Sequence, residues 1–312
     1  MTAQSTTRIR VAASTPGSYW WEIGIMLQRA LNRHGVKAKL DPATFDIHNV
    51  RAVADGRCTL GITMPPYLDW ATRRIGTLAD YPGPEPLVIA AINQPVWIAA
   101  AADRSTEAAT LGGLISLGLP WRPLMPKEDT LLAAYVDGLL ELHGSSRAAL
   151  ADCGGGWVPP YGNVRPSTIT RVDPAQEANG LFFHVSWTVQ WARDLSTRRD
   201  LRFLHFEEAH LDTLAARLGA QKLRMPHRLF PGVDEDITTL GWTQQYIYGT
   251  SQTDPLLVRQ VIQALDQAGD DLLLNAQGHS YTPGREPRLI PGVRLHPAAS
   301  DYYRTPRSSA ES

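Results

Sequence analysis

Short apolar runs alternate with longer amphipathic segments through the first hundred residues. The alternation of apolar and polar positions predicts strands at Arg8–Ser14, Val36–Leu40 and Cys58–Met64. Between them, apolar residues recur at helical spacing in Tyr19–His34 and Phe45–Asp55, and a glycine follows each segment. This β-α-β-α-β order is typical of a largely parallel sheet flanked by helices.

The middle of the chain continues as an α/β pattern. Leu87–Ile92 and Val96–Ala102 are predicted as two strands separated by residues 93–95, where the chain could pass into a second lobe. The further elements predicted here are strands at Leu114–Leu119, Leu181–Val185 and Leu201–Phe206, helices at Asp129–His143 and Glu207–Leu218, and a helix between the last two strands. Residues 145–176 (Ser145–Gln176) are rich in Gly, Pro and Ser without a clear period, and we expect an excursion or lid there.

The last third of the chain predicts a return to the first lobe. Thr239–Tyr248 is suited to a strand that carries the chain back, and Asp254–Leu274 and His296–Tyr303 are predicted helices. We therefore expect lobe 1 to comprise residues 1–97 and 240–312, with lobe 2, residues 98–239, inserted in it.

Composition and charge narrow the classes of function. The chain has 312 residues, of which 43% are hydrophobic and 20% charged, enough for a sizeable core in each of two lobes. The formal net charge of -1 argues against a nucleic-acid partner, since a phosphate-binding surface needs a basic excess. No apolar run approaches the roughly 18 residues needed for membrane insertion. A small molecule is the expected partner.

The N-terminal MTAQSTTRIRVAAS lacks the apolar segment of a secretory signal. As written, the chain is expected in the cytoplasm, whereas a chain processed from a longer precursor would be periplasmic or at the cell surface. Cys58 and Cys153 are the two cysteines, expected as free thiols. No nucleotide-binding loop or G-x-S-x-G motif is present, so we expect no cofactor. We expect no metal either: His205 and His210 flank Glu207-Glu208 without H-E-x-x-H spacing, which favours a solvated helix start.

Four collinear stretches carry a family resemblance. They are ASTPGSYW at residues 13–20 with Gly24, NVRAVADG at 49–56 followed by Leu60-Gly61-Ile62, FPGVDEDITTLG at 230–241, and LHPAASDYY at 295–303. In this order they resemble the TAXI family, the solute-binding subunits of one class of TRAP transporter. The resemblance implies a two-lobed periplasmic-binding-protein type II architecture, each lobe a mostly parallel sheet flanked by helices. It also implies venus-flytrap closure on a small organic ligand and a TRAP membrane permease as partner.

In such an architecture the ligand contacts loops at the carboxyl ends of parallel strands and the helix N-termini that follow. The candidate ligand-binding residues chosen by that rule are Ser18, Tyr19, Trp20, His48, Asn49, Thr63 and Met64 in lobe 1, and Trp121, Arg122, His184, Ser186 and Trp187 in lobe 2. Several have a simpler alternative: Ser18 as a helix cap, the ring of Tyr19 or Trp20 as core, His48 facing solvent, Met64 and Trp187 as core, and Arg122 on the surface.

The ligand and the activity stay open at this stage. Where the family usually has a Gly/Ser turn, residues 118–130 offer Trp121 and cationic side chains, so the resemblance does not carry over a ligand. We expect a carboxylate-bearing organic molecule, with an aromatic part as one option. The alternative is a cytosolic enzyme on the same fold, a decarboxylase-like or dehydratase-like lyase or a ring-rearranging enzyme, with His48, His184 and Cys153 as catalytic candidates.

Overall fold

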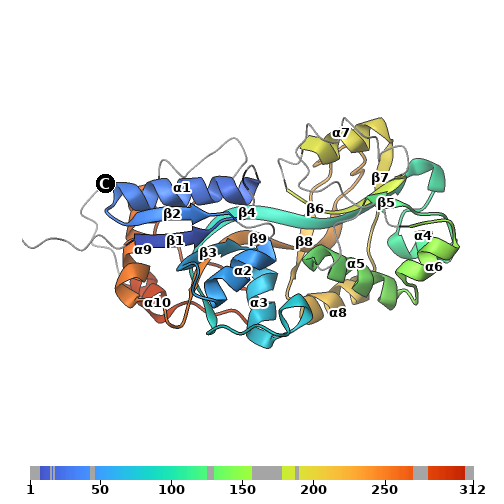
Figure 1. Cartoon of the computed structure of the whole chain (residues 1–312). Coiled ribbons are helices and arrows are strands. Elements are labelled where there is room, and N and C mark those ends of the chain that lie inside the picture. The colour runs from blue at the N-terminus through green and yellow to red at the C-terminus, as the bar shows by residue number, and fades with distance from the viewer. Residues whose placement is uncertain are drawn as a thin grey trace, which may run out of the picture. The chain divides into compact units, whose positions relative to one another are not determined.

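The computed structural model describes residues 8–14, 16, 18–42, 46–124, 130–156, 178–186, 190–269 and 280–305, without the side chains of residues 19, 46 and 190–192. The chain forms two compact units, unit 1 of residues 1–94 and 244–312 and unit 2 of residues 95–243 (Figure 1). The sequence places the corresponding boundaries at 97/98 and 239/240. No helix of the described part is both long and apolar enough to cross a bilayer.

Unit 1 is built on a mixed sheet in the order β2-β1-β3-β9-β4. Its elements are β1 (Arg8–Ala12), α1 (Tyr19–Arg33), β2 (Lys37–Asp41), α2 (Asp46–Ala54), β3 (Leu60–Thr63), α3 (Pro65–Arg73), a 3₁₀ turn (Gly76–Leu78), the first part of β4 (Pro86–Asp103), the last part of β9 (Ile237–Thr250), α9 (Pro255–Gln267) and α10 (Pro297–Arg304). Strand β1 pairs in parallel with β2 and β3, whereas β9 returns antiparallel to β3.

Helix α1 shows why the sequence pattern predicts this unit. Ile23, Leu27, Ala30 and Leu31 recur at three- and four-residue intervals and are all buried. Ser18 caps the helix, its Oγ accepting a hydrogen bond from the amide of residue 21 at 3.2 Å. The helix packs on β2 and lies beside α9. The predicted strand-helix alternation of the first sixty residues is confirmed to within a few residues at each end.

Unit 2 contains the second part of β4 and the first part of β9. Its other elements are a 3₁₀ turn (Arg104–Thr106), α4 (Leu111–Ser116), β5 (Pro123–Leu124), α5 (Leu131–Leu142), α6 (Arg147–Asp152), β6 (Gly180–Val185), α7 (Gln190–Arg198), β7 (Leu201–Phe203), α8 (Glu208–Leu218) and β8 (Gln221–Met225). Strand β6 pairs in parallel with β5 and antiparallel with β4, and the β4–β7 and β8–β9 pairs are antiparallel. Parallel pairing is therefore the rule for the three N-terminal strands of unit 1, while unit 2 is mixed.

Two element predictions need correction, and helix α3 has no counterpart in the sequence prediction. Leu114–Leu119 does not form a strand: Thr110 Oγ1 accepts a bond from the Gly113 amide at 2.9 Å and starts α4, which buries Leu111 and Leu114 three residues apart. The two strands predicted on either side of residues 93–95 form one continuous strand, β4. Within the predicted break, Asn93 stays extended and exchanges main-chain hydrogen bonds with Ser280. Pro65-Pro66 ends β3 and also begins α3, since proline suits the first turn of a helix.

Candidate functional site

The carboxyl ends of β1, β2 and β3 lie along one edge of the unit 1 sheet, because the three strands run parallel. Helices α1, α2 and α3 begin directly after these strands, so their N-termini are brought to the same edge. A helix N-terminus presents main-chain N–H groups without helical acceptors and a partial positive charge. This edge is the part of unit 1 best suited to hold an anionic group.

Asn49 joins the ends of two of these strands. Its Oδ1 accepts the Ser14 amide N–H at 3.0 Å, and its Nδ2 donates to the Ile62 carbonyl at 2.9 Å. Ser14 has a φ of 62°, a left-handed conformation that a non-glycine residue adopts at a cost of about 1–3 kcal/mol. Asn49, predicted to bind ligand, is fully buried and uses both ends of its amide to hold the strand ends in place. Both ends of the Asn49 amide are therefore engaged with the main chain at this edge.

The first turn of α1 contributes a buried aromatic residue. Trp20 is 9% exposed, and its Nε1 donates to Gln245 Oε1 in β9 at 3.4 Å. The oxygen of Ser18 is engaged in the helix cap, as its simpler alternative holds, and the side chain of Tyr19 lies outside the description. Trp20 therefore orients the Gln245 amide on β9.

Two buried glutamine amides lie on adjacent strands of this sheet. Both amide atoms of Gln94 and the Nε2 of Gln245 are buried and have no hydrogen-bond partner among the described residues. Asn93 and Gln244 bond to each other across β4 and β9 at 2.9 Å, so the next residues, Gln94 and Gln245, project from the opposite face. That face is the one contacted by Trp20. The sequence pattern missed both glutamines because each lies inside an apolar strand.

Thr63 and Met64 end β3 at the same edge. The Thr63 hydroxyl is buried and has no partner among the described residues. Thr63 pairs with Tyr246, so it projects from the face opposite to Gln245. Met64 is 5% exposed and precedes α3 without a side-chain cap. His48 is exposed in the first turn of α2.

The unit 2 candidates fall into separate environments. His184 on β6 stacks on Phe183 with ring centroids 4.6 Å apart and lies 6.4 Å from the Trp242 ring. Burial lowers the pKa of His184 to about 4, which keeps the imidazole neutral at physiological pH. The indole nitrogen of Trp242 is buried without a partner among the described residues. Ser186, just after β6, is 3% exposed.

Trp121 does not offer its ring to a ligand. It is 1% exposed, and its Nε1 donates to the Ala101 carbonyl at 3.1 Å, so it belongs to the core of unit 2. Arg122 is exposed beside it. Cys153 is an exposed thiol at the C-terminal cap of α6, and Cys58 is buried. Trp187 lies outside the described residues, as does most of the segment 145–176.

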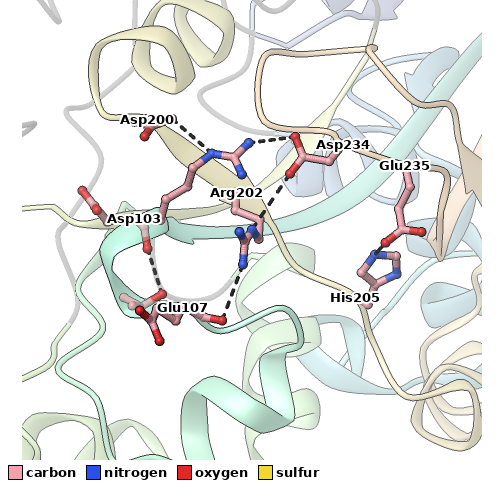
Figure 2. A network of polar contacts seen from close by, with 9 residues as sticks. Asp103, Glu107, Asp200, Arg202, His205, Asp234 and Glu235 are labelled. Atoms are coloured by element: carbon pink, nitrogen blue, oxygen red, sulfur yellow. Dashed lines mark hydrogen bonds and ion pairs between the residues drawn. The ribbon is translucent and has the colours of Figure 1, made fainter.

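The acidic residues Asp234 and Glu235, within the TAXI-like stretch at residues 230–241, form ion pairs inside unit 2. Asp234 accepts from Arg104 at 2.7 Å and lies 3.9 Å from Arg202, and the Arg104 hydrogen bond keeps the pKa of Asp234 below its usual value (Figure 2). His205 also contacts Glu235 (Figure 2), with its Nε2 3.1 Å from Glu235 Oε1. These contacts join the loop before β9 to β7 and the turn after β4, which gives this stretch a structural role.

A cavity of about 380 Å³ lies at the other end of the unit 1 sheet. It is lined by Leu87 at the start of β4, by residues 251–253 after β9, and by Arg259, His296 and Asp301 at the start of α9 and in α10. Burial lowers the pKa of His296, whose Nδ1 caps α10. This cavity is a second place in unit 1 where a small molecule could fit.

No family model matches this sequence, and no curated protein does either. Among solved structures, the chain is similar to PhnD1 from Prochlorococcus marinus (MIT 9301) in complex with methylphosphonate. The identity is 11%, covering 89% of this chain and 94% of that one, with a TM-score of 0.53. A periplasmic transporter is 14% identical over 90% of each chain with a TM-score of 0.49. MatC (Rpa3494) from Rhodopseudomonas palustris with bound malate is 12% identical over 89% and 91%, also at 0.49.

The likeness to PhnD1 shows the fold alone, an α/β chain with a mixed sheet and flanking helices, and the predicted α/β class is confirmed. The mostly parallel sheet predicted for each lobe is found in β1, β2 and β3 of unit 1, whereas unit 2 pairs mainly antiparallel. At this identity the likeness concerns the fold and leaves the ligand open. The TAXI resemblance remains a prediction.

Proposed function

We propose that this chain is a solute-binding protein that holds a small, carboxylate-bearing organic ligand at the strand-end edge of unit 1. The observation that carries the proposal is the pair of buried amides, Gln94 and Gln245, whose hydrogen-bonding atoms have no partner among the described residues. Leaving a buried polar group unsatisfied costs about 1–3 kcal/mol. A bound ligand that satisfies these atoms removes that cost and so gains affinity.

The chemistry of the edge indicates the kind of ligand. The Nε2 groups of Gln94 and Gln245 are donors, and the nearby start of α1 adds main-chain donors and a positive dipole. These groups favour an anion. Gln94 Oε1 is an acceptor, so the ligand needs a donor of its own near the anion. Hydroxy acids and amino acids combine both features, and the ring of Trp20 suits an apolar part beside them.

In its ligand-bound form the chain is proposed to deliver the ligand to a TRAP-type membrane permease. This role rests on the four ordered stretches that resemble the TAXI family, and a periplasmic or cell-surface location would accompany it. PhnD1, a protein of the same fold, is described in complex with methylphosphonate, so small phosphonates belong among the ligands to be tested beside carboxylates.

The test is a thermal-shift screen of the purified chain against hydroxy acids, amino acids, aromatic acids and methylphosphonate, followed by calorimetry on any hit. A ligand that binds the folded chain raises its melting temperature. We expect Gln94→Met to weaken binding at least tenfold, because it removes both the donor and the acceptor. Arg259→Ala, in the cavity at the other end of the sheet, is the matched control and should bind normally.

Two results would contradict the proposal. If Arg259→Ala abolishes binding and Gln94→Met leaves it intact, the ligand occupies the cavity near α9 and α10. If the hit is converted to a product by the wild-type chain, and the conversion is lost in His48→Ala or His184→Ala, the chain is an enzyme on this fold.

A further inference from the structure

Three metal-ligating side chains converge in unit 2, outside the residues considered above for ligand binding. His143 follows the last turn of α5, Glu207 is the residue before α8, and His210 lies in the first turn of α8. The reactive atoms are His143 Nε2, Glu207 Oε2 and His210 Nδ1, which all lie within 4.8 Å of one another. The sequence places Glu207 and His210 three residues apart, and folding brings His143 to them.

The distances within this cluster match those between ligands of one metal ion. His143 Nε2 lies 3.0 Å from Glu207 Oε2 and 3.3 Å from His210 Nδ1, and the third distance, between His210 Nδ1 and Glu207 Oε2, is 3.8 Å. Ligand atoms about 2.1 Å from a tetrahedral ion are about 3.4 Å apart. The three atoms therefore form a triangle of the size that such an ion occupies.

Glu207 Oε2 provides a second observation. This oxygen is buried and makes no hydrogen bond of acceptable geometry, although two imidazole nitrogens are its close neighbours. The two rings meet edge to face, with centroids 4.4 Å apart. Glu207 Oε2 and His143 Nε2 are within hydrogen-bonding distance, so it is the angle and not the distance that leaves this oxygen without a hydrogen bond.

The start of α4 packs against one side of the three-residue cluster, and the other side is accessible to solvent. A Cβ atom added to Gly112, at the start of α4, would lie 2.4 Å from Glu207 Oε1 and 2.7 Å from His143 Cε1, so a third segment presses against the site. The His143 side chain is 9% exposed, while Glu207 is 39% and His210 24% exposed. Water can therefore reach a fourth coordination position.

We propose that His143, Glu207 and His210 bind a divalent transition-metal ion, with Zn²⁺ as the ion that best suits two imidazoles and one carboxylate. Calcium and magnesium prefer all-oxygen ligands and are not expected to bind here. The ion would join the end of α5 to the start of α8, two helices that pack on each other in unit 2. Its first effect is to stabilise unit 2.

The experiment uses the full chain without a polyhistidine tag, stripped of metal by a chelator. Zinc uptake is measured by elemental analysis and calorimetry, and Co²⁺ serves as a visible probe of tetrahedral coordination. The variants are Glu207→Gln, His210→Asn and His143→Gln. The matched controls are His205→Ala and Glu208→Gln, because both lie in the same stretch of sequence and neither belongs to the cluster.

We expect one Zn²⁺ per wild-type chain, a raised melting temperature with Zn²⁺ but not Mg²⁺, and the visible bands of tetrahedral Co²⁺. Affinity should fall on the order of 100-fold or more in the three variants, since loss of even an outer partner costs 10–100-fold. The controls should bind as the wild type does. If His143→Gln fails to fold, the other two variants decide the matter.

The proposal is overturned if the wild-type chain takes up no stoichiometric Zn²⁺ or Co²⁺, which would leave the cluster as a proton-sharing network. It is equally overturned if Glu207→Gln and His210→Asn, folded as shown by circular dichroism, bind as tightly as the controls. Failure of this test leaves the solute-binding proposal untouched, because the two rest on different units.

Discussion

Trp20 Nε1 lies 3.4 Å from Gln245 Oε1 and donates a hydrogen bond to it, joining the first turn of α1 to β9. This bond fixes the orientation of the glutamine amide: its oxygen is engaged by the indole, and its Nε2 is left without an acceptor among the described residues. A donor held in this way is preorganised, so little conformational entropy is lost when a ligand accepts its hydrogen bond.

Replacing Gln94, the other buried amide on this face of the sheet, tests whether its role is to bind ligand or to stabilise the fold. Gln94→Met should leave the melting temperature of the ligand-free chain unchanged or slightly raised, because an unsatisfied buried polar group is exchanged for an apolar one of similar size. Gln244→Met is the matched control. It should lower the apparent stability by about 1–3 kcal/mol, since it removes bonds to Asn93 Oδ1 and the Arg288 amide. Equal losses in urea denaturation would mean that Gln94 serves the fold.

In contrast to Gln94, Asn49 should matter for the stability of the fold more than for ligand binding. Asn49→Leu leaves the Ser14 N–H and the Ile62 carbonyl buried without their partner, and we expect a loss of about 2–4 kcal/mol by chemical denaturation. Ligand affinity, measured well below the melting temperature, should change less than in Gln94→Met. A variant of normal stability that no longer binds ligand would restore Asn49 to the ligand-contacting residues.

The comparison of Asn49 with Gln94 shows what sequence reasoning can reach. The position of Asn49, near the start of a helix that follows a strand, is readable from hydrophobic periodicity, and so the edge itself was predicted. Whether its amide faces a ligand or two main-chain groups depends on contacts with Ser14 and Ile62, which no local pattern encodes. Gln94 carries no local signal, because its burial and its lack of partners arise only from tertiary packing.

Unit 2 was harder to predict for a related reason. Its strands are short or pair antiparallel with segments distant in sequence, as β7 does with β4. The apolar run at residues 114–119 predicts a strand, yet the Thr110 cap and the spacing of Leu111 and Leu114 start a helix, α4, that includes residues 114–116 of this run. The His143 cluster was missed because the first histidine is remote in sequence from Glu207 and His210.

Gly232, in the turn before β9, is predicted to be irreplaceable. Its φ is 90°, and an added Cβ would lie 1.9 Å from the Leu201 carbonyl oxygen, a distance that no side chain can relieve. Gly232→Ala should therefore cost about 3 kcal/mol or more. Gly144→Ala, at a φ of 67° with open space around it, isolates the conformational cost alone, about 1–2 kcal/mol. Comparable losses for the two variants in urea denaturation would rule out the backbone contact as the cause.

His184 should make stability depend on pH. Burial lowers its folded-state pKa to about 4, whereas an unfolded histidine titrates near 6.5. As pH falls through about 6.5, the histidine is protonated in the unfolded chain but not in the folded chain. Its contribution to the free energy of unfolding is therefore complete above that pH. It is progressively lost between about pH 6.5 and 4, by an amount on the order of 1–3 kcal/mol.

Denaturation of the wild type and of His184→Gln at several values between pH 7 and pH 4.5 checks this. The variant should lose less stability on acidification, because glutamine does not titrate. Some slope will remain, since burial also lowers the pKa values of His143 and His296. Parallel curves for the wild type and His184→Gln would show that the imidazole ring between Phe183 and Trp242 is accessible to protons in the folded chain.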